Sequence, residues 1–500
     1  MSGTLGQAFR RGFLGNAPSW YKRLVVAFLL VNPLLLVTLG PTVTGWAVLL
    51  EFIVTLAMAL RCYPLQPGGL IALEAVLLGL TSPESAYQEV VTALPVLLLL
   101  MFMVAGIYFL RDLLLTVFTG LLLRIRTSST LSLTICVVAA VLSAFLDALT
   151  VVAVLVTVGL GFYDVYHRAA SGKRLDDEHD PAQDETVPEP QARSLDQFRA
   201  FLRGLMMHGA VGTAIGGVTT QVGEPQNLLI AKQAEWEFGQ FFLEVAPVSL
   251  PVAAAGFVTC WLVDRSRMFG YGAELPDDVR AVLQAHQQQH ESRASPRDRQ
   301  ALVVQAAVAA VLVLSLALHV AEVGLIGLLV IVLATAFTGI VEEHRIGKAF
   351  EAAMPFTALL VVFFVIVAQI HDQHLFEPVI HQVLALEGRA QAAMLYVATG
   401  VLSAISDNVF VATIYITEIK AAFLQGATTR EQFDVLAVAI NAGTNIPSVA
   451  TPNGQAAFLF LLTSLLAPLI RLGYLRMVWM ALPYFVVMTT VGLAAVVWIL

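Results

Sequence analysis

Two aspartates stand in nearly the same sequence frame, each inside an apolar stretch. Leu142–Asp147 reads LSAFLD and Leu402–Asp407 reads LSAISD, one copy in each half of the 500-residue chain. A carboxylate at membrane depth costs several kcal/mol unless it is paired or protonated, so it indicates a functional site. Two of them in a duplicated frame predict a transporter in which each half supplies part of an ion site.

Exchange of protons for a hard cation is the chemistry that these aspartates favour. A carboxyl group binds a proton, and the carboxylate left after its release offers oxygen ligands of the kind that hard cations accept. Hydroxyl and amide groups near the aspartates could complete the oxygen shell: Ser143, Thr150, Ser403, Ser406 and Asn408. Serine and threonine in apolar helices also bond back to their own backbone, so a structural role is the alternative for each.

Two segments rich in glycine, proline and polar residues predict broken helices facing the aspartates. Proline removes a backbone donor, and the freed carbonyls with nearby polar side chains could coordinate a cation. The candidate ligands are Thr219, Thr220, Glu224 and Asn227 in the first segment and Thr444, Asn445, Thr451 and Asn453 in the second. Glu224 could be a third titrating group or an orienting acceptor. We align Val222–Pro225 with Val449–Pro452; a kink used only for packing is the alternative.

Composition places the chain in the membrane. It is 58% hydrophobic and 13% charged, with a mean hydropathy of +0.79. Apolar segments recur from Leu24 onward and are long enough to cross a hydrocarbon core of ~30 Å. The three cysteines are dispersed, and Walker A, nucleophile-elbow and HExxH motifs are absent from the sequence. We therefore expect no cofactor, no enzymatic activity and no nucleic-acid partner.

The positive-inside rule gives the orientation. Arg10, Arg11, Lys22 and Arg23 place the N-terminus in the cytoplasm. The predicted fold is an all-α polytopic membrane protein with inverted-topology repeats, two re-entrant hairpins, two broken helices and about 11 full spans. Its parts are N-terminal scaffold spans (1–90), repeat 1 (91–263: hairpin 129–165, linker 166–198, broken helix 199–232), a polar cytoplasmic segment (264–300) with a surface helix at Asp277–Arg293, connecting scaffold spans (301–350) and repeat 2 (351–500: hairpin 390–425, broken helix 433–468).

Some features of this topology stay open. Both flanks of 129–165 are basic, which fits either a hairpin with Asp147 at its tip or two full spans; we favour the hairpin because the repeat surrounds a polar tip with protein. The scheme places Arg389, Lys420 and Arg430 outside, against the charge rule. We expect the acidic segment 83–89 to lie outside, a solvated outer loop around His371–His374, and a mobile acidic linker at 166–198.

Long blocks of the chain resemble the NhaB family of bacterial sodium/proton antiporters. The blocks are Asn16–Pro33, Leu100–Phe109, Leu142–Val151, Gly223–Leu228, Ser403–Tyr415, Asn445–Ser464 and Met477–Tyr484. The resemblance implies electrogenic exchange of cytoplasmic Na⁺ and Li⁺ for external protons across the bacterial inner membrane, in sodium homeostasis and salt tolerance. It also implies an elevator-like motion of a transport domain against a scaffold, commonly in homodimers, with the Na⁺ site around Asp147 and Asp407.

Rival functions predict features that the motifs lack. A cation-coupled carrier of organic anions or oxyanions calls for a fixed positive charge, and the hairpin and broken-helix motifs contain no Arg or Lys. An intramembrane aspartyl protease also uses two membrane aspartates, but it is expected to carry Gly-x-Gly-Asp, which neither frame does. A scaffolding subunit without transport leaves the paired carboxylates unexplained.

Overall fold

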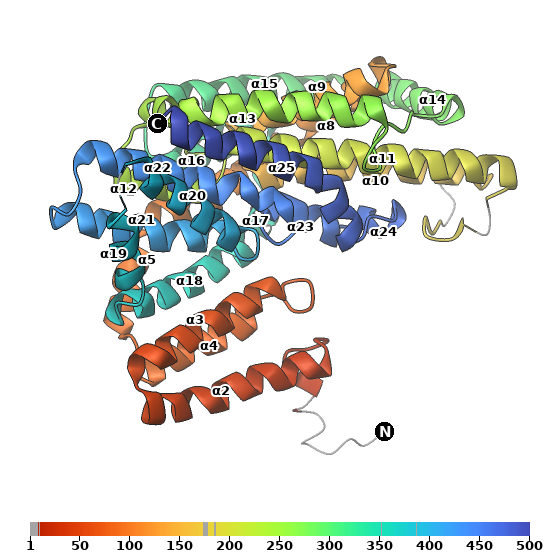
Figure 1. Ribbon diagram of the computed structural model, residues 1–500. Coiled ribbons are helices and arrows are strands. Elements are labelled where there is room, and N and C mark those ends of the chain that lie inside the picture. The colour runs from red at the N-terminus through yellow and green to blue at the C-terminus, as the bar shows by residue number, and fades with distance from the viewer. Residues whose placement is uncertain (1–8, 10, 174–178, 185–186, 352, 387) are drawn as a thin grey trace.

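The computed structural model describes residues 9, 11–173, 179–184, 187–351, 353–386 and 388–500, and within these ranges helices are the only regular elements, with no strand. Three N-terminal helices, α2 (Ser19–Leu39), α3 (Pro41–Ala57) and α4 (Leu65–Leu77), project from one side of the main body (Figure 1). One buried amide joins them: Asn32 Nδ2 donates to Glu51 at 2.7 Å and to Glu74 at 2.8 Å. Each of the three helices therefore contributes one polar group to a shared contact.

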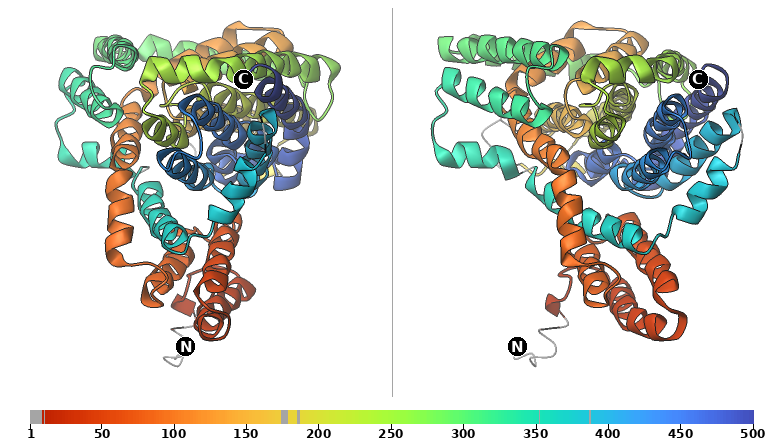
Figure 2. Two further views of the ribbon diagram at one scale, coloured as in Figure 1. Left: turned by 60° about the vertical axis from the view of Figure 1, so that its left-hand side comes forward. Right: turned by 90° about the vertical axis from the view of Figure 1, so that its left-hand side faces the viewer.

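A bent segment links this unit to the body (Figure 2). It consists of α5 (Pro83–Thr92), α6 (Leu94–Leu98), the π-helix η1 (Leu99–Met103) and α7 (Val104–Tyr108), with a bend of 61° before Leu94. The acidic segment 83–89, predicted to lie outside, is the start of helix α5. Pro83 suits the first helical position, and the Ser82 hydroxyl accepts from the backbone N–H of Ser85 at 2.9 Å, which caps α5.

Both apolar stretches that carry an aspartate are interrupted at the predicted positions. In the first half the elements are α8 (Arg111–Arg124), α9 (Ser128–Ser143), α10 (Ala148–Ala170), α11 (Glu189–Gly217) and α12 (Pro225–Ala234). In the second half they are α20 (Arg389–Ser403), α21 (Asn408–Leu424), α22 (Arg430–Asn445), the 3₁₀ turn η3 (Pro447–Ala450), α23 (Ala456–Thr463) and α24 (Leu466–Leu469). Asp147 and Asp407 each stand directly before the second helix of their pair.

The remaining helices surround these pairs. They are α13 (Phe238–Ser266), α14 (Asp277–Arg293), α15 (Pro296–Ala317), α16 (Val323–Thr338), α17 (Glu343–Glu351), α18 (Met354–Asp372), α19 (Glu377–Leu384) and α25 (Tyr474–Trp498). The predicted surface helix is confirmed as α14. Among the described residues, six helices are long and apolar enough to cross a membrane, or seven when the bent segment counts as one span, and four further apolar helices are shorter. The chain is thus an all-α polytopic membrane protein.

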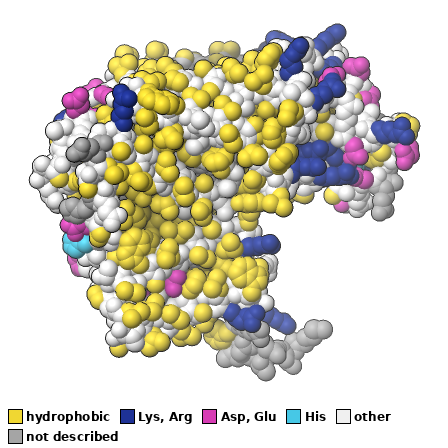
Figure 3. Space-filling view, viewed as in Figure 1, with side chains coloured by type: hydrophobic (Ala, Val, Ile, Leu, Met, Phe, Trp, Pro, Cys, Tyr) yellow, Lys and Arg dark blue, Asp and Glu magenta, His cyan; other side chains and the backbone are white. Residues whose placement is uncertain are grey.

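The surface has the character of a membrane protein. Apolar side chains cover most of the face in Figure 3, whereas Lys and Arg gather toward the end of the body where α14 and the N-terminal end of α11 lie. Within α2, only 11% of the most apolar 18-residue window is buried, although that helix is strongly apolar. In water such a helix would need a protein partner, whereas a bilayer solvates it directly.

The acidic linker is more ordered than the sequence suggests. Helix α10 continues to Ala170 and α11 begins at Glu189, so both ends of the predicted 166–198 linker are helical. Within the described part of the linker, Asp184 pairs with Arg199 at 2.6 Å and with Arg471 at 3.3 Å. Burial acts to raise the pKa of Asp184, but the hydrogen bond and charge of Arg199 outweigh it and hold the pKa below its usual range.

The polar outer segment after α18 is also tied to its neighbours. His371 still belongs to α18, and its Nδ1 lies 2.7 Å from the Glu89 carboxylate. The hydroxyl of Thr81 donates to Asp372 at 2.8 Å. The solvated loop predicted around His371–His374 is therefore wrong for its first two residues, because polar groups on the segment from Thr81 to Glu89 satisfy them.

Close backbone contacts hold α9 against α11. Gly212 and Gly216 face the carbonyls of Cys136 and Ala140, and a Cβ at either glycine would overlap the facing carbonyl oxygen. Small residues four apart allow helix backbones in membranes to approach in this way. The second half repeats the contact, since a Cβ at Gly443 would lie 2.7 Å from the Tyr396 carbonyl oxygen.

This packing predicts that Gly216→Ala destabilises the protein. The added methyl group must displace the Ala140 backbone, and overpacking of this kind costs about 1–3 kcal/mol. Gly161→Ala is the control, because Gly161 lies in α10 with no atom within 4 Å of its ideal Cβ position. Thermal unfolding in detergent should show a lower midpoint for Gly216→Ala and no decrease for Gly161→Ala. Equal midpoints for the two variants would contradict the packing argument.

Candidate functional site

The two interrupted regions face one cavity of about 330 Å³. Asp147, Glu224 and Asp407 line it together with Asn408 and Asn453. Another part of the lining comes from other elements, through Leu56 of α3 and Ala59 just after it, Leu100 of η1 and Leu359 of α18. The structure thus brings together the two aspartates of the duplicated frame, and it adds the glutamate of the first broken helix.

Each aspartate is held at the start of a helix. The Asp147 carboxylate accepts from the backbone N–H of Thr150 at 3.3 Å, and Asp407 accepts from Val409 at 2.9 Å and Phe410 at 3.3 Å. A helix start offers unpaired backbone N–H groups and the positive end of the helix dipole, both of which favour an anion. Thr150 therefore takes part through its backbone N–H.

The two tips dock onto the two broken helices by matching contacts. The Thr220 hydroxyl donates to the Ala144 carbonyl, and the Thr451 hydroxyl donates to the Ala404 carbonyl at 2.5 Å. Two glycines make the same close approach: a Cβ at Gly223 would lie 2.8 Å from the Ser143 carbonyl oxygen, and one at Gly454 would lie 2.6 Å from that of Ser403. Thr220 is thus equivalent to Thr451, and Gly223 to Gly454.

These contacts correct the alignment of the broken helices. Pairing Val222–Pro225 with Val449–Pro452 by sequence is wrong, because the structure matches Gly223 with Gly454 and hence Glu224 with the next residue, Gln455. The two prolines, which suggested the alignment, occupy different positions relative to the tips. A glutamate in one half therefore corresponds to its neutral isostere in the other.

An amide network joins the two broken helices to each other. Gln226 donates to the Asn445 side-chain oxygen at 2.8 Å, and Asn445 donates to the Asn227 side-chain oxygen at 2.9 Å. Asn227 also donates to the carbonyls of Gly217 and Thr220, each at 2.7 Å. The candidate ligands Asn227 and Asn445 are thus committed to holding the helix breaks together.

Two more candidate ligands bond to their own helices. The Thr219 hydroxyl donates to the Gly216 carbonyl at 2.6 Å, and the Thr444 hydroxyl donates to the Ile440 carbonyl at 2.9 Å. Backbone bonding of this type is the ordinary fate of threonine in apolar helices. These hydroxyls therefore have a structural partner already.

Several buried oxygens near the breaks have no hydrogen-bond partner in the described part of the chain. They are the hydroxyls of Ser143, Ser403 and Ser406, one side-chain oxygen each of Glu224, Asn408 and Asn453, and the side-chain oxygen of Gln455. Buried polar atoms are nearly always satisfied, so a group of them calls for an explanation. The Asn453 amide nitrogen donates to the Ala57 carbonyl at 2.9 Å, which fixes the orientation of its free oxygen.

The charge of the cavity is one-sided. Its described lining contains three carboxyl groups and no Arg, Lys or His. A carrier of organic anions or oxyanions would lack its fixed positive charge here. Among the described residues there is also no group of three or more His, Cys, Asp or Glu placed to hold one metal ion, so an ion shell here must include amide, hydroxyl or carbonyl oxygens.

Comparison with known proteins gives one consistent result. A family profile described as bacterial Na⁺/H⁺ antiporter B (NhaB) matches residues 1–500. A protein of Pseudomonas paraeruginosa is 63% identical over 99% of this chain and 99% of its own length. Proteins of Marinomonas sp. and Alcanivorax borkumensis are each 60% identical, over 98% and 99% of this chain and 98% and 93% of their own lengths. All three carry the name Na(+)/H(+) antiporter NhaB.

The amide network predicts a structural role for Asn445. Asn445→Ala leaves the Gln226 amide N–H and the Asn227 side-chain oxygen without their partner, and a buried unsatisfied polar group costs about 1–3 kcal/mol. Thr444→Ala is the matched control, because the Thr444 hydroxyl bonds only within its own helix. The midpoint of thermal unfolding in detergent should fall clearly further for Asn445→Ala than for Thr444→Ala. The role is refuted if the Asn445 variant is as stable as the control.

Proposed function

The chain belongs to the NhaB family of bacterial Na⁺/H⁺ antiporters, and from this premise we propose that Asp147, Glu224 and Asp407 form the site where Na⁺ and protons compete. A family of this kind performs secondary transport and is not an enzyme. The observation that carries the proposal is the meeting of three carboxyl groups, from both halves of the chain, on a cavity whose described lining has no cationic side chain.

The three carboxyl groups differ in their hydrogen bonds, and we assign their roles from that difference. Asp147 and Asp407 each have backbone donors that stabilise the ionised form. Glu224 is only 4% exposed, one of its oxygens has no partner in the described chain, and both aspartates lie within electrostatic range. Glu224 therefore has to hold a proton or, when it is ionised, a cation, because a buried charge without a partner is strongly disfavoured.

Exchange follows from this competition. Na⁺ binds to carboxylates that have released their protons, with Asn408, Asn453 and the hairpin-tip hydroxyls of Ser143, Ser403 and Ser406 supplying neutral oxygens. Protons arriving from the other side return the carboxyl groups to the neutral form and release Na⁺. Li⁺, another hard monovalent cation, uses the same oxygens. With three carboxyl groups on the cavity, one bound Na⁺ can displace more than one proton, and exchange with that ratio carries net charge and is electrogenic.

Alternating access requires the site to move relative to the wall that closes it. We assign the hairpins and broken helices to the moving part, since the carboxylates lie on them, and the wall formed by α3, η1 and α18 to a fixed scaffold. The proposed units are scaffold 1–90, repeat 1 at 91–263, connecting spans 301–350 and repeat 2 at 351–500, with the segment 264–300 in the cytoplasm. A homodimer would pair two scaffolds.

The proposed topology has the two hairpins re-entering an inner bacterial membrane from opposite sides, about 11 full spans and a cytoplasmic N-terminus. The matching tip contacts of the two halves support the repeat. Ion pairs support the orientation: Lys420 lies 2.8 Å from Glu235, and Arg430 lies 2.9 Å from Asp434. These carboxylates offset two cations that the scheme places outside, where the charge rule disfavours them.

The carboxylate site is tested by neutral isosteres. Asp147→Asn, Asp407→Asn and Glu224→Gln each keep the side-chain shape and remove the proton-binding group. Each should lower Na⁺-driven proton flux in everted vesicles by roughly tenfold or more, which corresponds to about 1.4 kcal/mol of binding or activation free energy. Glu244→Gln, on α13 outside the cavity, should keep wild-type flux.

Two further measurements sharpen this test. Asp→Glu at position 147 or 407 should retain part of the exchange with a shifted pH profile, because the carboxyl group is kept. A potential-sensitive dye should report a Na⁺-dependent membrane potential in wild-type vesicles. Near wild-type flux in all three isosteres, in protein shown to be inserted and folded, would refute the site. If the dye signal does not change while Na⁺ and protons are exchanged, exchange is not electrogenic, but the carboxylate site is unaffected by that result.

The topology is tested by cysteine labelling in a chain whose native cysteines, Cys62, Cys136 and Cys260, are replaced. Membrane-impermeant thiol reagents should label Thr127→Cys and Ser171→Cys from the cytoplasm and Gln425→Cys from the outside. Phe145→Cys, at the first tip, should react far less from the outside than Gln425→Cys, because a re-entrant tip is enclosed by protein. Equal reaction of these two positions would favour two full spans.

A further inference from the structure

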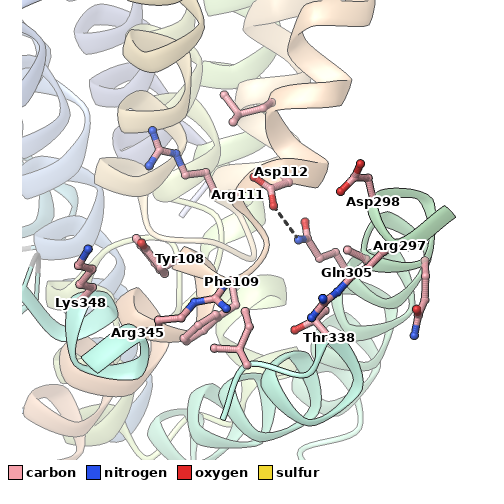
Figure 4. A pocket seen from close by; sticks show the side chains of 14 residues that line it. Tyr108, Phe109, Arg111, Asp112, Arg297, Asp298, Gln305, Thr338, Arg345 and Lys348 are labelled. Carbon is pink, nitrogen blue, oxygen red and sulfur yellow. Dashed lines mark hydrogen bonds between the residues drawn. The ribbon is translucent and has the colours of Figure 1, made fainter. Parts of the chain in front are cut away.

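A second cavity, of about 540 Å³, lies apart from the carboxylates and shares no described lining residue with their cavity (Figure 4). Its walls come from the end of α7, the start of α8, the start of α15, the residues that end and follow α16, and helix α17. The volume falls in the range typical of small-ligand sites. The transport proposal assigns no role to it.

Positive charge dominates this pocket. Four cations line it, Arg111, Arg297, Arg345 and Lys348, against two acids, Asp112 and Asp298. Both acids accept hydrogen bonds from uncharged groups. Gln305 donates to Asp112 at 3.3 Å, the contact drawn in Figure 4. Asp298 completes a capping box by accepting from the backbone N–H and the hydroxyl of Ser295, at 2.8 and 2.9 Å.

The four cations are weakly compensated. Arg111 donates to the uncharged hydroxyl of Thr157 at 3.1 Å. Arg345 lies 3.6 Å from Glu342, and since both side chains are about half exposed this pair contributes little. In the described part of the chain, Arg297 and Lys348 make no ion pair with a carboxylate, so the pocket presents net positive charge to an incoming anion.

Apolar surface adjoins the charged pocket. Phe109, Leu115 and Ile340 belong to its lining. Close by in the chain, Val303 on α15 is 70% exposed and Phe337 on α16 is 62% exposed. Both helices are strongly apolar, and they pack against each other along their lengths. A ligand that fills this site would therefore meet cations at one end and an open apolar helix pair at the other.

We propose that this pocket binds the phosphate headgroup of an anionic phospholipid, such as phosphatidylglycerol, whose acyl chains lie along α15 and α16. Basic pockets between membrane helices on the cytoplasmic side recognise such headgroups. A free phosphate shares the headgroup chemistry, but it would leave the apolar track unused. The inference rests on the proposed orientation, which places this end of α15 at the cytoplasmic surface, and not on the identity of the transported ion.

The site borders the machinery of transport. Helix α16 packs against η1 and α7, and Leu100 of η1 and Val104 of α7 line the carboxylate cavity. A lipid held between α8, α15 and α17 therefore contacts the elements that support the fixed wall of the ion cavity. Its bound headgroup would stabilise that wall.

Lipid binding is tested with the full-length protein purified in detergent and titrated with short-chain phosphatidylglycerol, with bound lipid counted by native mass spectrometry. Arg297→Gln/Lys348→Gln should bind it about tenfold to thirtyfold more weakly than wild type, since each surface cation favours an anionic lipid about fivefold. The control Arg265→Gln/Arg299→Gln removes the same charge at positions that do not line the pocket, and it should bind as wild type does.

Each other outcome overturns the proposal. Equal binding of phosphatidylcholine would show that the pocket does not recognise an anionic headgroup. Displacement of the lipid by inorganic phosphate at equal concentration would indicate that the ligand is a soluble anion. Equal weakening in both double variants would indicate diffuse surface charge. If the first double variant does not fold, Arg297→Gln against Arg299→Gln gives the same comparison with one charge each. No arm measures ion flux, so failure here and failure of the carboxylate site are distinguishable.

Discussion

A charged group at membrane depth needs donors that a continuous helix cannot give, since the helix uses its own backbone N–H groups. Helix interruptions solve this by exposing the first N–H groups of a new helix, and Asp147 and Asp407 sit at such starts. Each interruption must itself be covered. The Thr220 and Thr451 hydroxyls bond the tip carbonyls, and glycines let the broken helices approach closely enough to do so.

Much of this arrangement could be predicted from the sequence because it depends on local patterns. The duplicated LSA frame, the apolar runs and the proline-containing segments predicted both helix interruptions, and the surface helix predicted at Asp277–Arg293 is present. The sequence could only partly distinguish candidate residues that bind an ion from those that hold the structure together. Whether Asn227 and Asn445 hold each other or an ion depends on contacts between segments more than 200 residues apart, which no local pattern encodes.

The register of the broken helices shows the same limit. Two prolines suggested one alignment, whereas the glycines that touch the tips require another, with Glu224 equivalent to Gln455. The signal that could have revealed it is the pair Gly223 and Gly454, each preceded by a threonine three residues earlier. The corrected register makes the site asymmetric in charge. The two halves share a backbone framework, but only the first adds a third acid to the cavity.

The contact of Asn32 with Glu51 and Glu74 bears on biogenesis. Chains are synthesised from the N-terminus, so α2 enters the bilayer before the two glutamates follow on α3 and α4. The amide nitrogen of Asn32 is then already in place, and its two hydrogens can satisfy one carboxyl group from each arriving helix. The order of the helices in the chain thus places the polar partner of Glu51 and Glu74 in the membrane ahead of the two carboxyl groups.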